Sequence, residues 1–200
     1  YRDKYNRSGV RAEDVESLED YIIDIYEELY SKKGVEVLFE GAQGFGLDID
    51  HGDYPYVTSS HCTTASALLN GVPPQAVRSV WGVAKIYETY VGAKSFQPDG
   101  QVFDALQMIG EEFGATTGRK RQCNWMDLDN LMKAIRMNGV TDLVFNKMDV
   151  LREIGEWKLY DKQKVVEFDE EEKLKRWLTS HVSLTSQVSN IYFSGNKDRI

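Results

Sequence analysis

The chain has 200 residues, of which 24 are basic and 32 acidic, so its formal net charge is −8. A 42% hydrophobic content suits a globular chain with one sizeable core, and no apolar run approaches the roughly 20 residues of a membrane span. The acidic balance argues against nucleic acid as the main partner, because phosphate binding needs a basic face. Cys62 and Cys123 are too few for a secreted disulfide framework, so we expect a reducing, cytoplasmic compartment.

The first forty residues predict a helix and then a strand. Apolar residues recur at helical spacing from Ala12 to Lys33, and Gly34 supplies a stop. Val35–Glu40 then reads as a short strand that runs into a glycine-rich loop. The chain opens at Tyr1 without an initiator methionine or a signal-peptide pattern, which indicates a processed start or an excerpt.

Strands alternate with helices along the rest of the chain. Further strands are predicted at Thr141–Phe145 and Asn190–Phe193, each followed by a polar loop, and the charged run Phe168–Arg176 reads as a solvated helix face. Four more segments are helix candidates: Ser66–Asn70, Pro74–Val80, Asp104–Phe113 and Asp127–Met137. This order predicts an α/β fold with a partly parallel sheet, whose ligands lie off the carboxyl ends of the strands.

The first stretch with chemical character is Glu40-Gly41-Ala42-Gln43-Gly44. Small residues after a strand let the backbone approach a ligand closely, and the Gln43 amide offers a donor and an acceptor suited to a purine edge. The Thr58-Ser59-Ser60 hydroxyls that follow are candidate phosphate donors. The alternative is a tight turn whose hydroxyls bind only local backbone.

The second stretch, residues 114–121, places two threonines and three cations around two glycines. Arginine pairs bidentately with carboxylate or phosphate, so this loop is a candidate anion site, or else a solvated basic turn. The third stretch, Asn146-Lys147-Met148-Asp149, has the Asn-Lys-x-Asp pattern in which the carboxylate accepts from N1–H and the 2-amino group of guanine. A bare tetrapeptide also arises by chance.

The histidines, cysteines and tryptophans carry weaker signals. His51, His61 and His181 lack metal-ligand spacing, so no metal ligand is predicted in this chain. Cys62 and Cys123 read as buried thiols, and the tryptophans as core or interface residues.

Together and in order, these stretches resemble the adenylosuccinate synthetase family. The resemblance rests on seven segments: Glu40–Gly44, Leu47–Asp50, Tyr54–Ser60, Val91–Ala93, Gly114–Arg121, Lys147–Leu151 and Ser194–Gly195. It implies a P-loop NTPase-like, largely parallel central sheet flanked by helices, in one catalytic domain over residues 1–200. It also implies that this domain is incomplete at the N-terminus, where the phosphate-binding loop and the catalytic Asp and His belong, and slightly at the C-terminus.

The resemblance also implies roles for individual residues. For the purine monophosphate, Gln43 would stabilise the reacting O6 as the catalytic residue, Thr58 would bind the 5′-phosphate, and Val91 and Arg119 would lie at the ribose. Arg7 would reach the 5′-phosphate in the partner subunit of a homodimer. L-Aspartate would be bound by Thr116, Thr117, Arg119 and Arg121, and the donor nucleotide by Asn146, Lys147, Asp149, Ser194 and Gly195.

The implied reaction is a Mg²⁺-dependent ligation. A nucleoside triphosphate phosphorylates the purine O6, and the aspartate amine then displaces phosphate. Departures such as Tyr90, where the family usually has Arg, resemble the phage branch that acts on dGMP in the 2-aminoadenine pathway of DNA modification. The ordinary GTP-dependent enzyme, which acts on IMP in AMP biosynthesis, is the alternative.

Two further questions stay open from sequence. Asn146–Asp149 favours GTP as the donor, whereas the altered closing loop leaves ATP or dATP available. A guanine-nucleotide switch and a non-catalytic nucleotide-binding module are the competing function classes. Neither competitor needs an aspartate loop.

Overall fold

The computed structural model describes residues 15–31, 33–114 and 118–196. Contacts within the chain divide it into two units, Tyr1–Glu40 and Gly41–Ile200. In its described part, the first unit holds a 3-10 helix, η2 (Glu16–Tyr21), and the short helix α2 (Ile25–Tyr30).

Two sequence predictions for the first unit are wrong. The single helix expected from Ala12 to Lys33 is broken between η2 and α2, and Val35–Glu40 forms no strand. Short helices are marginal in water without tertiary packing, and Leu18, Ile22 and Ile23 are all exposed here. A strand exists only through pairing, and no described segment pairs with residues 35–40.

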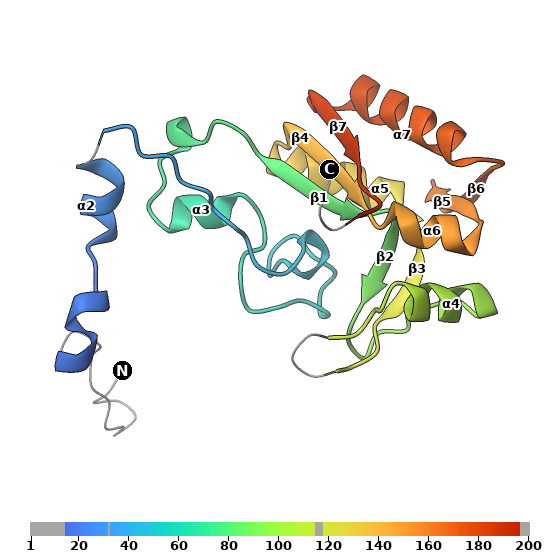
Figure 1. The fold of residues 1–200 in the computed structure, drawn as a ribbon, viewed down its shortest axis with the longest axis horizontal. Coiled ribbons are helices and arrows are strands. Elements are labelled where there is room, and N and C mark those ends of the chain that lie inside the picture. The colour runs from blue at the N-terminus through green and yellow to red at the C-terminus, as the bar shows by residue number, and fades with distance from the viewer. Residues whose placement is uncertain (1–14, 32, 115–117, 197–200) are drawn as a thin grey trace. The chain divides into compact units, whose positions relative to one another are not determined.

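A parallel three-stranded sheet forms one part of the second unit. Its strands are β1 (Trp81–Lys85), β4 (Asp142–Asn146) and β7 (Asn190–Phe193), in the order β1-β4-β7 (Figure 1). β4 lies between the other two and is buried along nearly its whole length, as its continuous apolar run predicts. The predicted strands at 141–145 and 190–193 are therefore confirmed, whereas β1 was not expected.

A second, mixed sheet contains the strands that the sequence did not reveal. Its order is β2 (Tyr87–Tyr90), β3 (Gln122–Asp127), β5 (Trp157–Asp161) and β6 (Lys164–Phe168). β3 and β5 are parallel, and the outer pairs are antiparallel. The β5–β6 turn places Lys162 and Gln163 at positive φ, where Asn-Gly is usual, so this hairpin carries no local signal.

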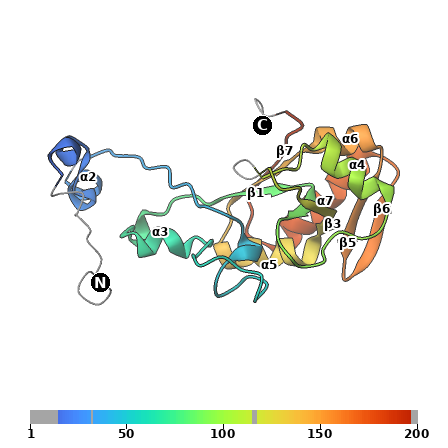
Figure 2. The same ribbon diagram turned by 90° about the horizontal axis from the view of Figure 1, so that it is seen from below.

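Helices cover these sheets. The longer ones are α4 (Gln101–Ile109), α5 (Leu128–Asn138) and α7 (Glu171–Thr185), and the shorter ones are α3 (Ala65–Leu69) and α6 (Met148–Ile154). Figures 1 and 2 both show α4 beside α6, and these helices are in contact. Two 3-10 turns, η3 (Phe45–Leu47) and η4 (Pro74–Ala76), complete the list.

Some of the predicted helices are confirmed, and others are displaced or wrong. Those at 66–70 and 127–137 are confirmed closely, and the one at 104–113 is displaced toward the N-terminus as α4. The helix predicted over Pro74–Val80 is wrong beyond the short η4, because the chain there turns to enter β1. Of the charged run 168–176 predicted to be a helix face, residues 171–176 form the start of α7, whereas Phe168 ends β6.

One apolar core joins the two sheets and their helices. Its fully buried members include Tyr87, Leu106, Phe145, Leu159 and Leu178, which come from both sheets and from α4 and α7. This arrangement confirms the predicted α/β fold with a mostly parallel sheet flanked by helices. Among the described residues, no helix is long and apolar enough to cross a bilayer.

Candidate functional site

The Asn-Lys-x-Asp motif lies at the carboxyl end of β4, against the loop that follows β7. The Met148 amide donates to the Ser194 carbonyl at 3.1 Å, and the Ser194 amide donates to the Phe145 carbonyl at 2.7 Å. Because β4 and β7 are parallel neighbours, both loops leave the same edge of the sheet. The structure thus brings together the residues predicted for the donor nucleotide: Asn146, Lys147, Asp149, Ser194 and Gly195.

Gly195 lies so close to α6 that it has no room for a side chain. A Cβ at this position would overlap Arg152 Nη1 and lie 3.1 Å from the Asp149 backbone nitrogen. Arg152 is itself fixed, because its Nε and Nη2 donate to the two Glu171 carboxylate oxygens at 2.7 and 2.6 Å. The closing loop therefore packs directly on the first turn of α6.

Lys147 connects this edge to the end of α4. The residue has a left-handed backbone (φ 65°) at the N-cap of α6, and its Nζ donates to the Gly110 carbonyl at 3.0 Å. The neighbouring Asn146 Oδ1 is buried and accepts no hydrogen bond from any described residue. An unsatisfied buried oxygen beside a strained turn marks this loop as a place for a ligand or an ordered water.

The basic loop is a narrow hairpin. Phe113 and Lys120 form an antiparallel bridge, and the Gly114 amide donates to the Arg119 carbonyl at 2.8 Å. Arg119 is exposed and Arg121 is half-buried, so cations line the loop on both sides of Lys120. Thr116 and Thr117, predicted to bind aspartate, lie outside the described residues.

A buried carboxylate lies at the base of this hairpin. Glu112 accepts from Lys85 Nζ at 2.7 and 2.8 Å, from the Tyr87 hydroxyl at 2.8 Å and from Arg121 Nη1 at 3.0 Å. Burial acts to raise the pKa of Glu112, but the hydrogen bonds from Lys85 and Tyr87 outweigh it and hold that pKa below its usual value. Glu112 and Lys85 were not predicted from the sequence, because no motif around the basic loop shows which carboxylate neutralises its cations.

Gln122 holds the loop predicted to meet the ribose. Its Oε1 accepts from the Phe96 and Gln97 amides at 2.9 and 3.1 Å, and its Nε2 donates to the Lys94 carbonyl at 2.7 Å. Gln122 directly follows Arg121, so the loop that carries Val91 is fixed to the same strand end as the basic hairpin. Val91 itself is 39% exposed.

The Gln43 loop forms a compact turn with the Thr58–Ser60 stretch. The Thr58 amide donates to the Leu47 carbonyl at 2.8 Å, and the Ile49 amide donates to the Ser60 carbonyl at 3.2 Å. Gln43 is exposed and has a left-handed backbone (φ 67°). The structure therefore places the residues predicted for O6 and for the 5′-phosphate on one folded segment, whereas Arg7 lies outside the described residues.

Asp48 fixes this segment from within. Its carboxylate accepts from three backbone amides, those of Asp50, His51 and Cys62, at 3.0, 2.9 and 2.6 Å. Burial acts to raise the pKa of Asp48, but these hydrogen bonds lower it overall. A carboxylate bound in this way stays ionised and holds the two ends of the loop together.

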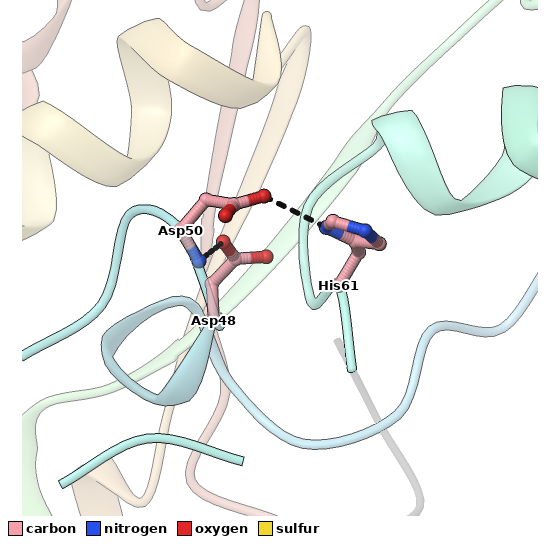
Figure 3. A group of neighbouring side chains, drawn as sticks. All are labelled: Asp48, Asp50 and His61. Atoms are coloured by element: carbon pink, nitrogen blue, oxygen red, sulfur yellow. Dashed lines mark hydrogen bonds and ion pairs between the residues drawn. The ribbon is translucent and has the colours of Figure 1, made fainter. Parts of the chain in front are cut away.

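The structure also brings Asp48, Asp50 and His61 close enough to share a metal ion, which the sequence did not predict (Figure 3). Their candidate ligand atoms lie within 4.8 Å of one another, and His61 Nδ1 lies 3.3 Å from Asp50 Oδ2. The spacing of the three histidines gives no sign of this grouping, because two of its three members are aspartates. Because both Asp48 oxygens already accept backbone hydrogen bonds, a cation would have to compete with the bonds that order the loop.

The parallel sheet, its polar strand ends and the cationic hairpin define an α/β ligand-binding protein. The family model for adenylosuccinate synthetase matches residues 10–194. The chain therefore belongs to the adenylosuccinate synthetase family, as its motifs indicated.

Individual relatives agree with this assignment. The adenylosuccinate synthetase of Desulfosudis oleivorans is 48% identical over 141 residues, which is 68% of this chain and 33% of that protein. The synthetase of Xylella fastidiosa strain 9a5c is 46% identical over 150 residues, 74% of this chain and 35% of that protein. The chain thus spans about a third of the length of these curated relatives.

Two solved structures share the fold. The fully ligated adenylosuccinate synthetase of Plasmodium falciparum superposes with a TM-score of 0.68 at 29% identity, over 88% of this chain and 46% of that one. The cyanophage S-2L succinoaminodeoxyadenylate synthetase bound to dGMP and dATP superposes with a TM-score of 0.53 at 22% identity. It covers 76% of this chain and 42% of that chain, and at this identity the likeness concerns the fold alone.

Proposed function

We propose that the protein carrying this chain is an adenylosuccinate synthetase, a ligase that forms a C–N bond between L-aspartate and C6 of a 6-oxopurine nucleotide. The observation that carries the proposal is the contact between the two predicted ligand regions. Lys147 of the donor motif binds the carbonyl of Gly110, two residues before the Glu112 that holds Arg121. This contact joins the motif proposed to bind the donor nucleotide to the hairpin proposed to bind aspartate, which supports one site in which both substrates meet.

The proposed reaction has two steps, and different residues act in each. In the first, the purine O6 attacks the γ-phosphorus of the donor, the bond from that phosphorus to the β–γ bridging oxygen breaks, the nucleoside diphosphate leaves, and the purine N1 loses its proton. Gln43 donates a hydrogen bond from its amide to O6 in this step, while Thr58 holds the 5′-phosphate. In the second, the aspartate amine attacks C6, the C6–O bond breaks, phosphate leaves, and the amine loses a proton. Thr116, Thr117, Arg119 and Arg121 hold the aspartate carboxylates, so that the amine meets C6 in line.

We propose IMP as the acceptor rather than dGMP. The bacterial synthetases are 44–48% identical to this chain, whereas the phage enzyme shares the fold at 22%. Tyr90, the departure that suggested a deoxynucleotide, has a packing role: its ring lies 5.8 Å from that of Phe96, with Lys94 Nζ 5.9 Å away. A substitution that serves loop packing gives no reason to expect a 2′-deoxy substrate.

GTP is the proposed donor. The Asp149 side chain follows the strained Lys147 turn and offers two acceptor oxygens, which match N1–H and the 2-amino group of guanine and find no such pair on adenine. Ser194 and Gly195 lie beside this motif, on the loop that follows β7, and would contact the other face of the base. ATP and dATP then serve as comparison donors in the test.

The family implies Mg²⁺ and a homodimer with Arg7 at the partner's site. Mg²⁺ would neutralise charge on the transferred phosphoryl group. The Asp48–Asp50–His61 group does not fit this ion, because Mg²⁺ prefers all-oxygen ligands and the Asp48 oxygens are already bonded to amides. No step is therefore assigned to a metal at that group.

Phosphate release tests the proposal. The protein made from the complete reading frame is assayed with IMP or dGMP, with GTP, ATP or dATP, and with and without L-aspartate. We expect release that needs aspartate and is fastest with IMP and GTP. GTP hydrolysis that does not need aspartate would instead indicate a guanine-nucleotide switch. Nucleotide binding without turnover would indicate a non-catalytic binding module, and faster turnover of dGMP than of IMP would indicate the phage-type reaction.

A further inference from the structure

We propose that Glu112 is a positioning residue, which holds the guanidinium of Arg121 in place to receive a carboxylate of L-aspartate. The inference rests on the proposed ligase function and adds to it a residue that contacts no substrate itself. Four kinds of observation support it: the number of contacts, the side of the guanidinium they use, the local charge and the packing around the carboxylate.

Glu112 binds Arg121 through both backbone and side chain. The Arg121 amide donates to the Glu112 carbonyl at 2.9 Å, and Arg121 Nη1 donates to Glu112 Oε2 at 3.0 Å. These two bonds fix the start and the end of a long, flexible side chain. Holding it in one rotamer before the substrate arrives removes an entropy cost from binding.

The geometry leaves the useful side of the guanidinium open. Glu112 accepts a hydrogen bond from Nη1 of Arg121. Within the described part of the chain, no group accepts a hydrogen bond from Nε or Nη2 of Arg121. Nε and Nη2 together form the parallel pair of donors that matches both oxygens of a carboxylate. The residue that anchors Arg121 therefore does not compete with the proposed substrate for that edge.

The local charge favours a second carboxylate. The Glu112 side chain is 2% exposed and faces two cations, Lys85 and Arg121, so the cluster keeps one positive charge in excess. Lys147 adds a further positive charge close enough to lower the pKa of Lys85, after the larger effect of burial. Because the cluster is partly buried, the effective dielectric constant is lower than in water, and an anionic ligand is attracted more strongly.

Packing fixes the carboxylate as well. The Tyr87 hydroxyl donates to Glu112 Oε1, and the Tyr87 hydroxyl oxygen lies so close to Gly110 that a Cβ there would overlap it. Gln107 Nε2 donates to the Glu112 carbonyl at 3.0 Å. Side chains from β1, β2 and α4 thus hold Glu112 from three directions, which gives it the rigidity that a positioning residue needs.

Kinetics of Glu112→Gln test the proposal in the protein from the complete reading frame. The amide keeps the size of the side chain but loses its charge, so Arg121 is held less firmly and Lys85 loses its counter-ion. We expect the KM for aspartate to rise by about tenfold or more, because a charged hydrogen bond to Arg121 is weakened, with the KM values for IMP and GTP nearly unchanged. Tyr87→Phe, which removes one donor to the carboxylate, is expected to move the same KM by a smaller factor.

Glu111→Gln is the matched control, because it makes the same charge change one residue away on an exposed side chain. A selective rise for Glu112→Gln and Tyr87→Phe but not for Glu111→Gln supports the proposal. Equal changes in all three KM values, or an unchanged aspartate KM, overturn it and leave the ligase function standing. If the wild-type protein shows no aspartate-dependent phosphate release, the function and this inference fall together. If Glu112→Gln does not fold, Tyr87→Phe alone tests the proposal: a selective rise in its KM for aspartate supports it, and an unchanged KM for aspartate overturns it.

Discussion

At the scale of single residues, Glu88 on β2 is the clearest source of pH dependence. Burial raises its pKa to about 7, the nearby Asp127 carboxylate adds to this, and the Asp127 amide and Lys94 oppose it. A carboxyl whose folded pKa is raised holds its proton more tightly in the folded than in the unfolded protein. Its contribution to stability is therefore present at low pH and is lost as the pH rises from about 4.5 toward 7.

Glu88→Gln should remove this loss, because the amide mimics the protonated acid and can still accept from the Asp127 amide. We expect the variant to gain on the order of 2 kcal/mol relative to wild type between pH 5 and pH 8. In thermal unfolding, the midpoint of the variant should rise relative to wild type by about 5 °C over that range. A midpoint difference that stays constant with pH would show that Glu88 is already ionised in the folded protein.

Replacing Gly195 is expected to weaken binding of the donor nucleotide. In Gly195→Ala the new Cβ overlaps Arg152 Nη1, and Arg152 cannot move freely because Glu171 holds it at two atoms. We expect the closing loop to shift and the Kd of GTP to rise by about tenfold, which corresponds to about 1.4 kcal/mol. Titration of each protein with GTP measures this Kd. Gly155→Ala, at the other end of α6, places a Cβ in open space on a left-handed residue (φ 74°), so it should lower stability without raising the Kd.

These residues also show how far sequence reasoning reached into the site. Asn146–Asp149 and Ser194–Gly195 could be proposed from the sequence as donor-binding residues, because they carry local patterns at strand ends, and the structure places both loops at one edge of the sheet. Glu112 and Lys85 were not, because a buried counter-ion is recognised only by what surrounds it. Asp48, Asp50 and His61 come together only through the fold of one loop.

At the scale of elements, α5 ends in a left-handed residue. Gly139 has φ 63° and ψ 40°, a conformation that costs a residue with a Cβ about 1 kcal/mol. Gly139→Ala should therefore lower the free energy of unfolding by about that amount, measured by urea denaturation. Gly139→Asn should lose less, since asparagine tolerates the left-handed region; equal losses would indicate that contact with Gln187 sets the cost instead.

Elements were predictable where local signals were strong. β4, α5 and β7 have clear apolar patterns, and α5 adds Asp127 as an N-cap and Gly139 as a stop. β3 was missed although the polar Gln122 and Asn124 alternate with the buried Cys123 and Trp125, which is the period-two pattern of a strand. The hairpin of β5 and β6 was missed because its turn lacks glycine and asparagine; the Lys162 amide instead binds the Asp129 carboxylate at 2.9 Å.

At the scale of the whole molecule, the core of the second unit depends on β4. Phe145 is fully buried and stacks on Phe193 with ring centroids 5.1 Å apart. Phe145→Ala should lower the free energy of unfolding by about 3–5 kcal/mol, a large share of the total for most proteins. Val165→Ala on β6, at a side chain 52% exposed, is the control and should cost far less.

If Phe145→Ala is too unstable to purify, Phe145→Leu gives a milder test of the same packing. Its loss should fall between those of the other two variants in denaturant unfolding. A loss no larger than that of Val165→Ala would show that β4 is not the centre of the core.

The α/β class, the family and the polar strand-end motifs Asn146–Asp149 and Ser194–Gly195 can all be recognised from the sequence, because each of them leaves a local pattern in the chain. Only the tertiary structure decided that Lys147 reaches Gly110 and that Glu112 anchors Arg121, and it also decided that residues 35–40 form no strand. The physical reason is the same in each case. Hydrogen bonds, ion pairs and strand pairing between distant segments depend on which partners the fold brings within reach, and local sequence does not record those partners.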